Sequence, residues 1–239
     1  MRLYLASSSP ARLALLRAAG IDPVVIPSSV DEDAALAAYA ADQGVAVEGL
    51  APEVVVLQLA RAKALAVADG AADPSREDAP VDGLVLGGDS MFELDGRILG
   101  KPHEPEVARE RWLAQRGRTG VLWSGHWLVD RRRGAEGEAL GGEGEGAVAS
   151  ASVSFAADLD DAEIDAYIAS GEPLEVAGAF TIDSLGGPFI DRVEGDPSTV
   201  VGLSLPTLRR LVRGFGVAWP QLWTRPADPA MDAEAQPQP

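Results

Sequence analysis

Strand-like and helix-like segments alternate along most of this chain of 239 residues, and this alternation constrains the fold more than any single motif. Short apolar runs typical of strands occupy residues 3–6, 83–88, 121–130 and 148–156. Runs with helical spacing occupy residues 10–19, 52–68, 106–115, 160–169 and 205–212. Asp95 and Gly96 separate two further strand-like runs and are typical of a tight antiparallel hairpin. The pattern predicts an α/β fold in which helices flank a mixed β-sheet.

The composition excludes several kinds of protein. With a formal net charge of −17, the chain should repel nucleic acid and anionic membranes, so we expect neither as a partner. It contains no cysteine, which excludes disulfides, thiolate zinc sites and cysteine nucleophiles. No apolar run approaches the roughly 20 residues of a membrane span, and the N-terminal run is too short for a signal peptide. We therefore expect a cytoplasmic protein, in which an anionic ligand would need a local basic cluster or a metal ion.

Two segments are predicted to lie outside the core. Residues 131–146 read RRRGAEGEALGGEGEG, which is low in complexity and typical of a loop that joins two strands. Residues 226–239 are polar and rich in proline, and we expect the chain to be disordered from about residue 226.

The segment SSSPAR is the first candidate for a functional site. It follows a strand-like run, so Ser9 falls near the N-cap of the next helix and Pro10 at its first position. The free amides of such a helix start would suit a phosphate group, as would the hydroxyls of Ser7 and Ser8 and the guanidinium of Arg12. The same residues also fit an ordinary capped helix with a solvated arginine, and both interpretations remain open at this point.

Carboxylates gather at two further places. Asp89 directly follows a buried strand-like run and two glycines, and carboxylates at such strand ends commonly face ligand crevices. The acids Asp31, Glu32 and Asp33 follow another short strand-like run. Oxygen ligands of this kind suit a hard divalent cation, although three acids in a loop are more often solvated.

Two of the 20 basic residues are lysines, Lys63 and Lys101. In a chain rich in Ala, Gly, Pro and Arg, a coding bias would turn most surface lysines into arginines. A lysine that remains is therefore a candidate for a compact point charge, with chance survival as the alternative. Lys101 follows the hairpin and could return to the crevice beside Asp89. The two histidines, His103 and His126, have no metal-ligand spacing, and we interpret both as structural.

Taken in order, the motifs resemble those of the Maf family of nucleoside triphosphate pyrophosphatases, in particular its actinobacterial branch. The resemblance is carried by LASSSPAR, VDED, LARAKA, GGDS, DGRILGKP and GGPFIDRVEGDPSTVVGLSLPTLRRLV. It runs from about Leu3 to Val212. It predicts one Maf-like domain over residues 1–216, with 131–146 as a loop insert and 217–239 as a C-terminal extension.

The resemblance implies the mixed-sheet fold of this family of house-cleaning nucleotide pyrophosphatases and its reaction. Members hydrolyse a nucleoside triphosphate between the α- and β-phosphates with Mg²⁺ or Mn²⁺ and release the monophosphate and pyrophosphate. This implies house-cleaning of non-standard or modified nucleotides, and a homodimer is compatible with it. Two alternatives are open: a non-catalytic regulator of cell division and septum formation, and a related triphosphatase that acts on deaminated purines.

The resemblance also assigns site residues. Asp89 falls on the family's general base, and Glu32 and Asp89 fall on its metal ligands. The substrate-binding positions are Ser8, Arg12, Lys63 and Lys101. The positions that separate substrate classes in the family are Ala11, Ser90 and Asp183, which here match neither the pyrimidine-preferring nor the 7-methylguanosine-preferring set. Because an ionised Asp183 only accepts hydrogen bonds, the adjacent N–H donors of guanine suit it better than uracil or thymine.

Overall fold

The computed structural model describes residues 1–70, 81–133 and 141–224. Within these ranges, seven strands form one sheet: β1 (Leu3–Ala6), β2 (Val24–Val25), β3 (Leu84–Leu94), β4 (Arg97–Leu99), β5 (Thr119–Asp130), β6 (Glu145–Phe155) and β7 (Ile190–Gly195). The α-helices are α1 (Pro10–Ala18), α2 (Glu32–Gln43), α3 (Pro52–Ala68), α4 (Pro105–Gln115), α5 (Asp161–Ala169), α6 (Pro197–Val201) and α7 (Leu205–Gly214). Short 3₁₀ helices are η1 (Val47–Gly49), η2 (Glu172–Glu175), η3 (Ala177–Ala179), η4 (Gly187–Phe189) and η5 (Trp219–Leu222). None of the helices in the described ranges combines the length and apolarity needed to cross a membrane.

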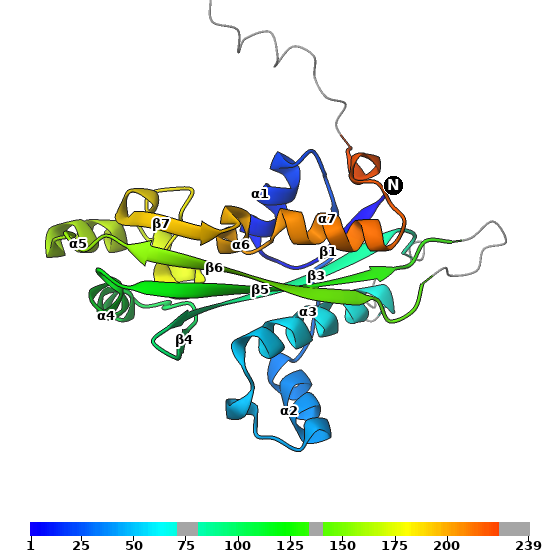
Figure 1. Ribbon diagram of the computed structural model, residues 1–239, viewed down its shortest axis with the longest axis horizontal. Helices are drawn as coiled ribbons and strands as arrows, with labels where there is room; N and C mark the ends of the chain where they lie inside the picture. The colour runs from blue at the N-terminus through cyan, green and yellow to red at the C-terminus, as the bar shows by residue number, and fades with distance from the viewer. Residues whose placement is uncertain (71–80, 134–140, 225–239) are drawn as a thin grey trace, which may run out of the picture.

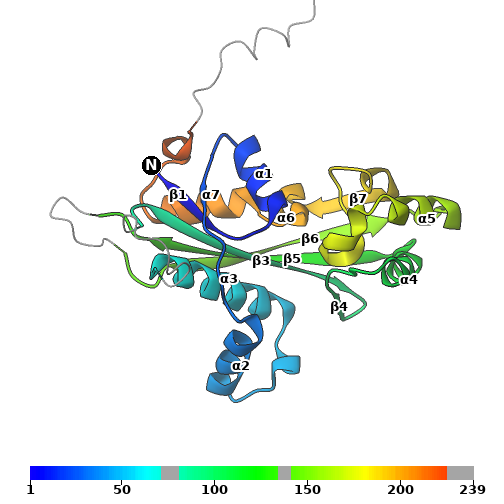
Figure 2. The same ribbon diagram turned by 180° about the vertical axis from the view of Figure 1, so that it is seen from behind.

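The sheet has the strand order β2-β1-β3-β5-β6-β7, and β4 pairs with β3 beside this path. β1 runs parallel to β2 and β3, whereas all other neighbours pair antiparallel. In Figure 1, α1, α6 and α7 lie on one face of the sheet and α2 and α3 on the other, while α4 and α5 lie at the end of the long strands. Figure 2 shows the same layers from behind. The predicted α/β fold with a mixed sheet and flanking helices is confirmed.

Two of the apolar clusters hold α1, α7, α4 and α5 against the sheet. The first lies between the sheet and helices α1 and α7, and its buried members include Leu5, Leu16, Leu86, Leu128 and Leu208. The second lies at the end of the long strands against α4 and α5, and its aromatic members are Phe92, Trp112, Phe155, Tyr167 and Phe180. These rings meet edge to face, as between Trp112 and Phe155 with centroids 5.5 Å apart, which is a favoured aromatic geometry.

Helix α3 lies close against the sheet because two glycines face it. A Cβ atom added at Gly87 would lie 2.0 Å from the carbonyl oxygen of Ala60, and one added at Gly125 would lie 2.2 Å from that of Val56. Any side chain at these positions would push the helix away from the strands. The close approach brings the middle of α3, which carries Lys63, next to β3.

Strand β3 is longer than the sequence pattern predicts. The pattern ends it at residue 88, but the strand continues to Leu94 because β5 pairs with it along almost its whole length and carries it through both glycines. β1, in contrast, stops at Ala6, which lies opposite Gly87. The prediction that Asp89 follows the end of its own strand is therefore wrong. Asp89 lies within β3, just beyond the point where the parallel neighbour ends.

The acids at residues 31–33, expected in a loop, instead form the start of helix α2. Asp31 is the N-cap, and its carboxylate accepts the backbone N–H of Ala34 at 2.9 Å. Glu32 is the first helical residue. Acidic side chains are favourable here because the helix N-terminus carries a partial positive charge. Because Glu32 is the first residue of α2, the helix fixes the position of its backbone. A flexible loop would leave that position variable.

Residues 180–182, which look strand-like in the sequence, form no strand. Gly178 and Ala179 directly precede them and have positive φ angles of 75° and 61°. These left-handed conformations turn the chain away from the sheet, so the segment becomes an irregular wall beside it.

The first part of the C-terminal extension packs onto the core. Leu222 of η5 is fully buried in the cluster beneath α7, and the backbone N–H of Thr224 donates to the carbonyl of Gly20 at 3.0 Å. The disorder predicted from residue 226, like residues 134–140 of the loop insert, lies outside the described residues.

His126 is buried in β5 in a neutral form, as its structural interpretation requires. Its Nε2 accepts the backbone N–H of Ser204 at 2.8 Å, so the neutral ring carries its proton on Nδ1, which lies 3.3 Å from the carbonyl oxygen of Ala147. A proton on Nε2 would place two donors against each other. Burial is the largest influence, and with the positive charge of Arg12 it lowers the pKa of His126 to about 4.

We expect this one side chain to make the protein less stable as the pH falls from about 6.5 to about 4. The unfolded chain takes up the proton near the ordinary pKa, whereas the folded protein takes it up only near the lowered one, so its contribution is fully present above that window. The lowered pKa of His126 corresponds to a loss of about 3 kcal/mol at most in the free energy of unfolding across this pH range. Denaturant unfolding at neutral pH and near the lower limit should show this loss in the wild type and little of it in His126→Gln. Equal losses of stability in the wild type and in His126→Gln would mean that His126 does not cause the loss.

Candidate active site

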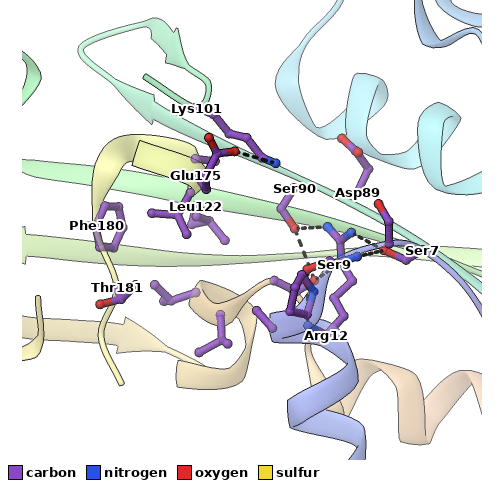
Figure 3. Close-up of a pocket in the computed structure, with 18 of the residues that line it drawn as sticks. Ser7, Ser9, Arg12, Asp89, Ser90, Lys101, Leu122, Glu175, Phe180 and Thr181 are labelled. Atoms are coloured by element: carbon purple, nitrogen blue, oxygen red, sulfur yellow. Dashed lines mark hydrogen bonds and ion pairs between the residues drawn. The ribbon is translucent and has the colours of Figure 1, made fainter. Parts of the chain in front are cut away.

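All the site residues that the family resemblance assigns line one pocket of about 710 Å³, whereas the other two candidate acids, Asp31 and Asp33, do not line it. Figure 3 shows part of this lining. The pocket opens where β1 ends and β3 continues, and its lining comes from the start of α1, the middle of α3 and the segment after η2. The predicted residues in this lining are Ser8, Ala11, Arg12, Glu32, Lys63, Asp89, Ser90, Lys101 and Asp183. Pockets of roughly 300–1,000 Å³ suit small organic ligands. The fold thus gathers residues that lie far apart in the chain.

The N-terminal turn of α1 forms one side of the pocket. Ser9 is the N-cap and its Oγ accepts the backbone N–H of Arg12 at 3.4 Å, while Pro10 takes the first helical position, as the sequence predicts. Ser7 is buried, and its Oγ accepts the backbone N–H of Ser9 at 3.2 Å. Ser8 is exposed and lines the pocket. Ser7 and Ser9 therefore hold the turn, and Ser8 is the serine available to a ligand.

Arg12 is only 8% exposed and is held by neutral acceptors. Its Nε donates to the carbonyl of Gly202 at 2.8 Å, its Nη1 to Ser7 Oγ at 3.0 Å and its Nη2 to Ser90 Oγ at 2.9 Å. Burial lowers the pKa of Arg12, and the negative charge of Asp89 partly offsets this. Among the described residues, no carboxylate forms an ion pair with the guanidinium. Because a buried charge without a counter-charge is costly, this side of the pocket is suited to an anionic ligand.

Lys63, Asp89 and Glu32 form a charged cluster in the same pocket. Nζ of Lys63 lies 2.7 Å from Oδ1 of Asp89 and 2.8 Å from Oε1 of Glu32. The side chains of Lys63 and Asp89 are each 13% exposed, whereas that of Glu32 is half exposed. Burial raises the pKa of Asp89 although Lys63 and Arg12 lower it. A carboxylate with a raised pKa accepts a proton more readily, which suits a general base.

The pocket has a second, mostly apolar wall. It is lined by Leu122, Phe180, Thr181, Ile182, Val200 and Val201. Asp183 adds a carboxylate to this wall, and Lys101 lies half exposed with its Nζ 3.8 Å from Oε2 of Glu175. Figure 3 shows Phe180 and Leu122 on one side of the pocket and Arg12 and Asp89 on the other. The pocket therefore has a charged end and an apolar end.

Sequence reasoning did not identify Glu175, Phe180 or Gly202 as pocket residues. Gly202 accepts from Arg12 across 190 positions of the chain. Glu175 approaches Lys101 because η2 folds back against the segment that follows β4, where the backbone N–H of His103 donates to the carbonyl of residue 174 at 3.0 Å. Such pairings arise only in the tertiary structure, so no local spacing signals them.

Ser90 contacts Arg12 and its neighbours. Its Oγ accepts from Nη2 of Arg12 at 2.9 Å and lies 2.9 Å from Ser124 Oγ and 3.3 Å from the carbonyl oxygen of Gly202. These contacts hold the guanidinium in place. The part of Ser90 in base selection, which the family resemblance implies, stays a prediction.

The two predicted metal ligands converge, because Glu32 and Asp89 both approach Nζ of Lys63. The described residues contain no group of three or more His, Asp or Glu side chains that could enclose a metal ion. Mg²⁺ usually needs only one or two carboxylates and takes its other oxygens from water and phosphate groups. The pair therefore fits a hard divalent cation that enters with phosphate oxygens, and it does not fit a closed structural metal site.

The chain is similar to known proteins over most of its length. A family model described as "Maf-like protein" matches residues 2–215. A curated relative named "Nucleoside triphosphate pyrophosphatase" from Leifsonia xyli subsp. xyli is 67% identical over 225 residues, which cover 94% of this chain and 98% of the relative. Relatives of the same name from Nocardia farcinica and Rhodococcus jostii are 52% and 50% identical. They cover 94% and 92% of this chain and are themselves covered over 98% and 94% of their lengths.

Proposed function

The chain belongs to the Maf family, and from this premise we propose that it is a nucleoside triphosphate pyrophosphatase. It hydrolyses the substrate between the α- and β-phosphates and releases the monophosphate and pyrophosphate. The observation that carries the proposal is the division of the pocket. Arg12 and the Lys63–Asp89 pair lie at one end, and the wall with Phe180 lies at the other. A triphosphate suits the charged end, and a nucleobase suits the apolar end.

Asp89 is the proposed general base. A water molecule attacks the α-phosphorus, its proton passes to the carboxylate, and the bond from the α-phosphorus to the bridging oxygen breaks. Pyrophosphate leaves with the bonding electrons. Burial supports this role because it raises the pKa of Asp89. The ion pair of 2.7 Å with Lys63 holds the carboxylate in place.

Positive groups stabilise the charge that develops on the phosphates. The N-terminal end of α1 with its partial positive charge, the guanidinium of Arg12 and the ammonium of Lys63 line the charged end, and Lys101 adds to them. Together they do not neutralise the roughly four charges of a triphosphate in a protein whose net charge is −17. We propose that Glu32 and Asp89 hold Mg²⁺ or Mn²⁺, which supplies the missing positive charge and polarises the phosphoryl oxygens.

Activity should therefore depend on a divalent cation. Excess EDTA is expected to abolish pyrophosphate release from nucleoside triphosphates, and Mg²⁺ or Mn²⁺ added beyond the chelator should restore it. The assay is a coupled measurement of pyrophosphate with and without chelator. Full activity in excess chelator would contradict the metal part of the proposal.

The enzyme should not favour dTTP or UTP, and it should prefer guanine or modified-base triphosphates. Asp183 is an exposed acceptor on the pocket wall, and Ala11 leaves room beside α1. Guanine offers N1–H and N2–H₂ side by side to a carboxylate, whereas uracil and thymine flank their one donor with carbonyl oxygens. Because the carbonyl oxygens of uracil and thymine would face the carboxylate of Asp183, kcat/KM for UTP and dTTP should be about tenfold lower than for GTP. A nucleotide panel in which dTTP and UTP exceed every purine by that factor would overturn this preference.

The same panel tests the alternatives. A non-catalytic regulator of cell division would release no pyrophosphate from any nucleotide. A triphosphatase for deaminated purines would favour inosine and xanthosine triphosphates over all others. The charged cluster around Lys63 supports catalysis, since a purely regulatory surface has no need of a buried carboxylate with a raised pKa such as Asp89.

A further inference from the structure

The apolar wall contains a segment without regular secondary structure of its own. Residues 180–186 follow η3 and include Asp183, which is exposed at the pocket. The turn before this segment is fixed by buried side chains of α4. Trp112 Nε1 donates to the carbonyl of Ala179 at 2.7 Å, and Gln115 Nε2 donates to the preceding carbonyl at 2.6 Å. The start of the segment is thus anchored, and its tip needs an anchor of its own.

That anchor is the carboxylate of Glu172, which accepts hydrogen bonds from five donors. They are Tyr167 Oη at 3.0 Å, Thr181 Oγ1, Ser184 Oγ at 2.6 Å, the backbone N–H of Leu185 at 3.2 Å and the backbone N–H of Gly186 at 3.1 Å. Four of the five belong to the wall segment itself, and they lie on both sides of Asp183 in the chain. The tip therefore wraps around a single side chain.

Glu172 is ionised at neutral pH. Burial alone would raise its pKa, but the hydrogen bonds from Ser184 and Thr181 above all lower the pKa of Glu172 to about 2. The bonds are therefore charge-assisted, which makes them shorter and stronger than bonds between neutral groups. A glutamine amide in this place would turn one acceptor oxygen into a donor that faces other donors.

Asp183 depends on this arrangement for its position. Within the part of the chain that the structure describes, its carboxylate accepts no hydrogen bond and forms no ion pair. Its neighbours Thr181 and Ser184, in contrast, both bond to Glu172. Where Asp183 lies relative to the pocket is therefore set by Glu172 through the backbone on either side.

We propose that Glu172 is a positioning residue for base recognition, because it holds residues 181–186 and so fixes where Asp183 meets the nucleotide base. The inference rests on the proposed function, in which the base occupies the apolar end. Glu172 is absent from the pocket lining, so it acts only through the wall. Its loss should weaken recognition of the nucleoside and leave the phosphate end unchanged.

The test compares Glu172→Gln with the matched control Glu163→Gln. Glu163 belongs to the capping box of α5, and the same amide substitution there changes neither the pocket nor the wall. The two products probe the two ends of the pocket, because only the monophosphate carries a base. For Glu172→Gln we expect the KM of GTP and the Ki of GMP to rise about tenfold, with the Ki of pyrophosphate unchanged. Glu163→Gln should match the wild type in all three.

Hydrogen exchange of backbone amides gives a readout that needs no activity. The N–H groups of Leu185 and Gly186 donate to Glu172, so both should exchange about tenfold faster or more in Glu172→Gln. Their exchange in Glu163→Gln should equal that of the wild type.

The outcomes separate the two proposals. A wild-type protein that hydrolyses no nucleoside triphosphate would overturn the proposed function. An active wild type with an unchanged Ki of GMP in Glu172→Gln, or with an equal rise in the Ki of pyrophosphate, would overturn the positioning inference alone. If Glu172→Gln does not fold, Ser184→Ala takes its place, because Ser184 is exposed on the wall. If only the Ki of GMP rises in Ser184→Ala, the inference is supported. If the Ki values of GMP and pyrophosphate rise equally, or neither rises, it is contradicted.

Discussion

Replacing Asp89 with asparagine should lower kcat for pyrophosphate release by about 10²–10⁴-fold and leave the fold intact. The amide has nearly the same shape as the carboxylate, but it takes up no proton at neutral pH and offers a cation no charge. Lys63, whose Nζ lies 2.7 Å from Oδ1, would still find an acceptor in the amide oxygen. Steady-state kinetics of the purified variant with saturating GTP and Mn²⁺ measure the loss.

The stability of Asp89→Asn should stay close to that of the wild type. Burial raises the pKa of Asp89, so the charged form is held against a desolvation penalty. The neutral amide avoids this penalty and offsets the weaker contact with Lys63. We therefore expect the thermal midpoint to move by no more than a few degrees. A large fall would mean that lost activity reflects unfolding.

Asp33→Asn is the matched control for this substitution. Asp33 is exposed one residue after Glu32 and does not line the pocket. It should keep near-full activity. If Asp89→Asn retains more than about a tenth of the wild-type rate, Asp89 is not the general base.

Local signals in the sequence were sufficient for the elements that carry most of the site. Pro52 and the apolar spacing behind it predict a helix over residues 52–68, which is where α3 lies. The cap at Ser9 with Pro10 likewise predicts the start of α1. Caps and periodicity depend on a few neighbouring residues, so a single sequence is enough to read them.

Contacts between distant parts of the chain could not be read in this way. Asp89 lies in mid-strand because β5 continues beside it after β1 has stopped, and the glycines before it suggest a strand end. Arg12 bonds to Gly202, and Glu172 collects donors from a segment without regular structure. The family resemblance predicted which residues share the pocket, but it gave no account of what holds them there.

Lys63→Ala is expected to lower kcat/KM by about 10²-fold, and arginine at this position should recover little of the loss. The lysine is 13% exposed and lies within 2.8 Å of both Asp89 and Glu32. Without it, Asp89 loses the ion pair that holds its carboxylate in place, and the phosphate end loses a positive charge. A guanidinium spreads its charge over a planar fork, so we expect it to replace the point charge between the two carboxylates poorly.

Lys101 provides the control for this substitution. Its side chain is half exposed, and its Nζ lies 3.8 Å from one oxygen of Glu175. Lys101→Ala should therefore lose less activity than Lys63→Ala. Lys101→Arg should recover most of the loss, because an exposed guanidinium has room to reach the same place.

Lys63→Ala should also bind a divalent cation more tightly than the wild type when no nucleotide is present. Removal of the ammonium leaves Glu32 and Asp89 without their shared positive partner, so Mn²⁺ meets two free carboxylates and no repelling charge. A ligand stabilises the folded protein in proportion to the logarithm of its concentration over Kd, so added Mn²⁺ should raise the thermal midpoint more in Lys63→Ala than in the wild type or Lys101→Ala. Equal rises in the three proteins would mean that Lys63 and the cation do not share these ligands. A fully active Lys63→Arg would mean that the lysine survives by chance.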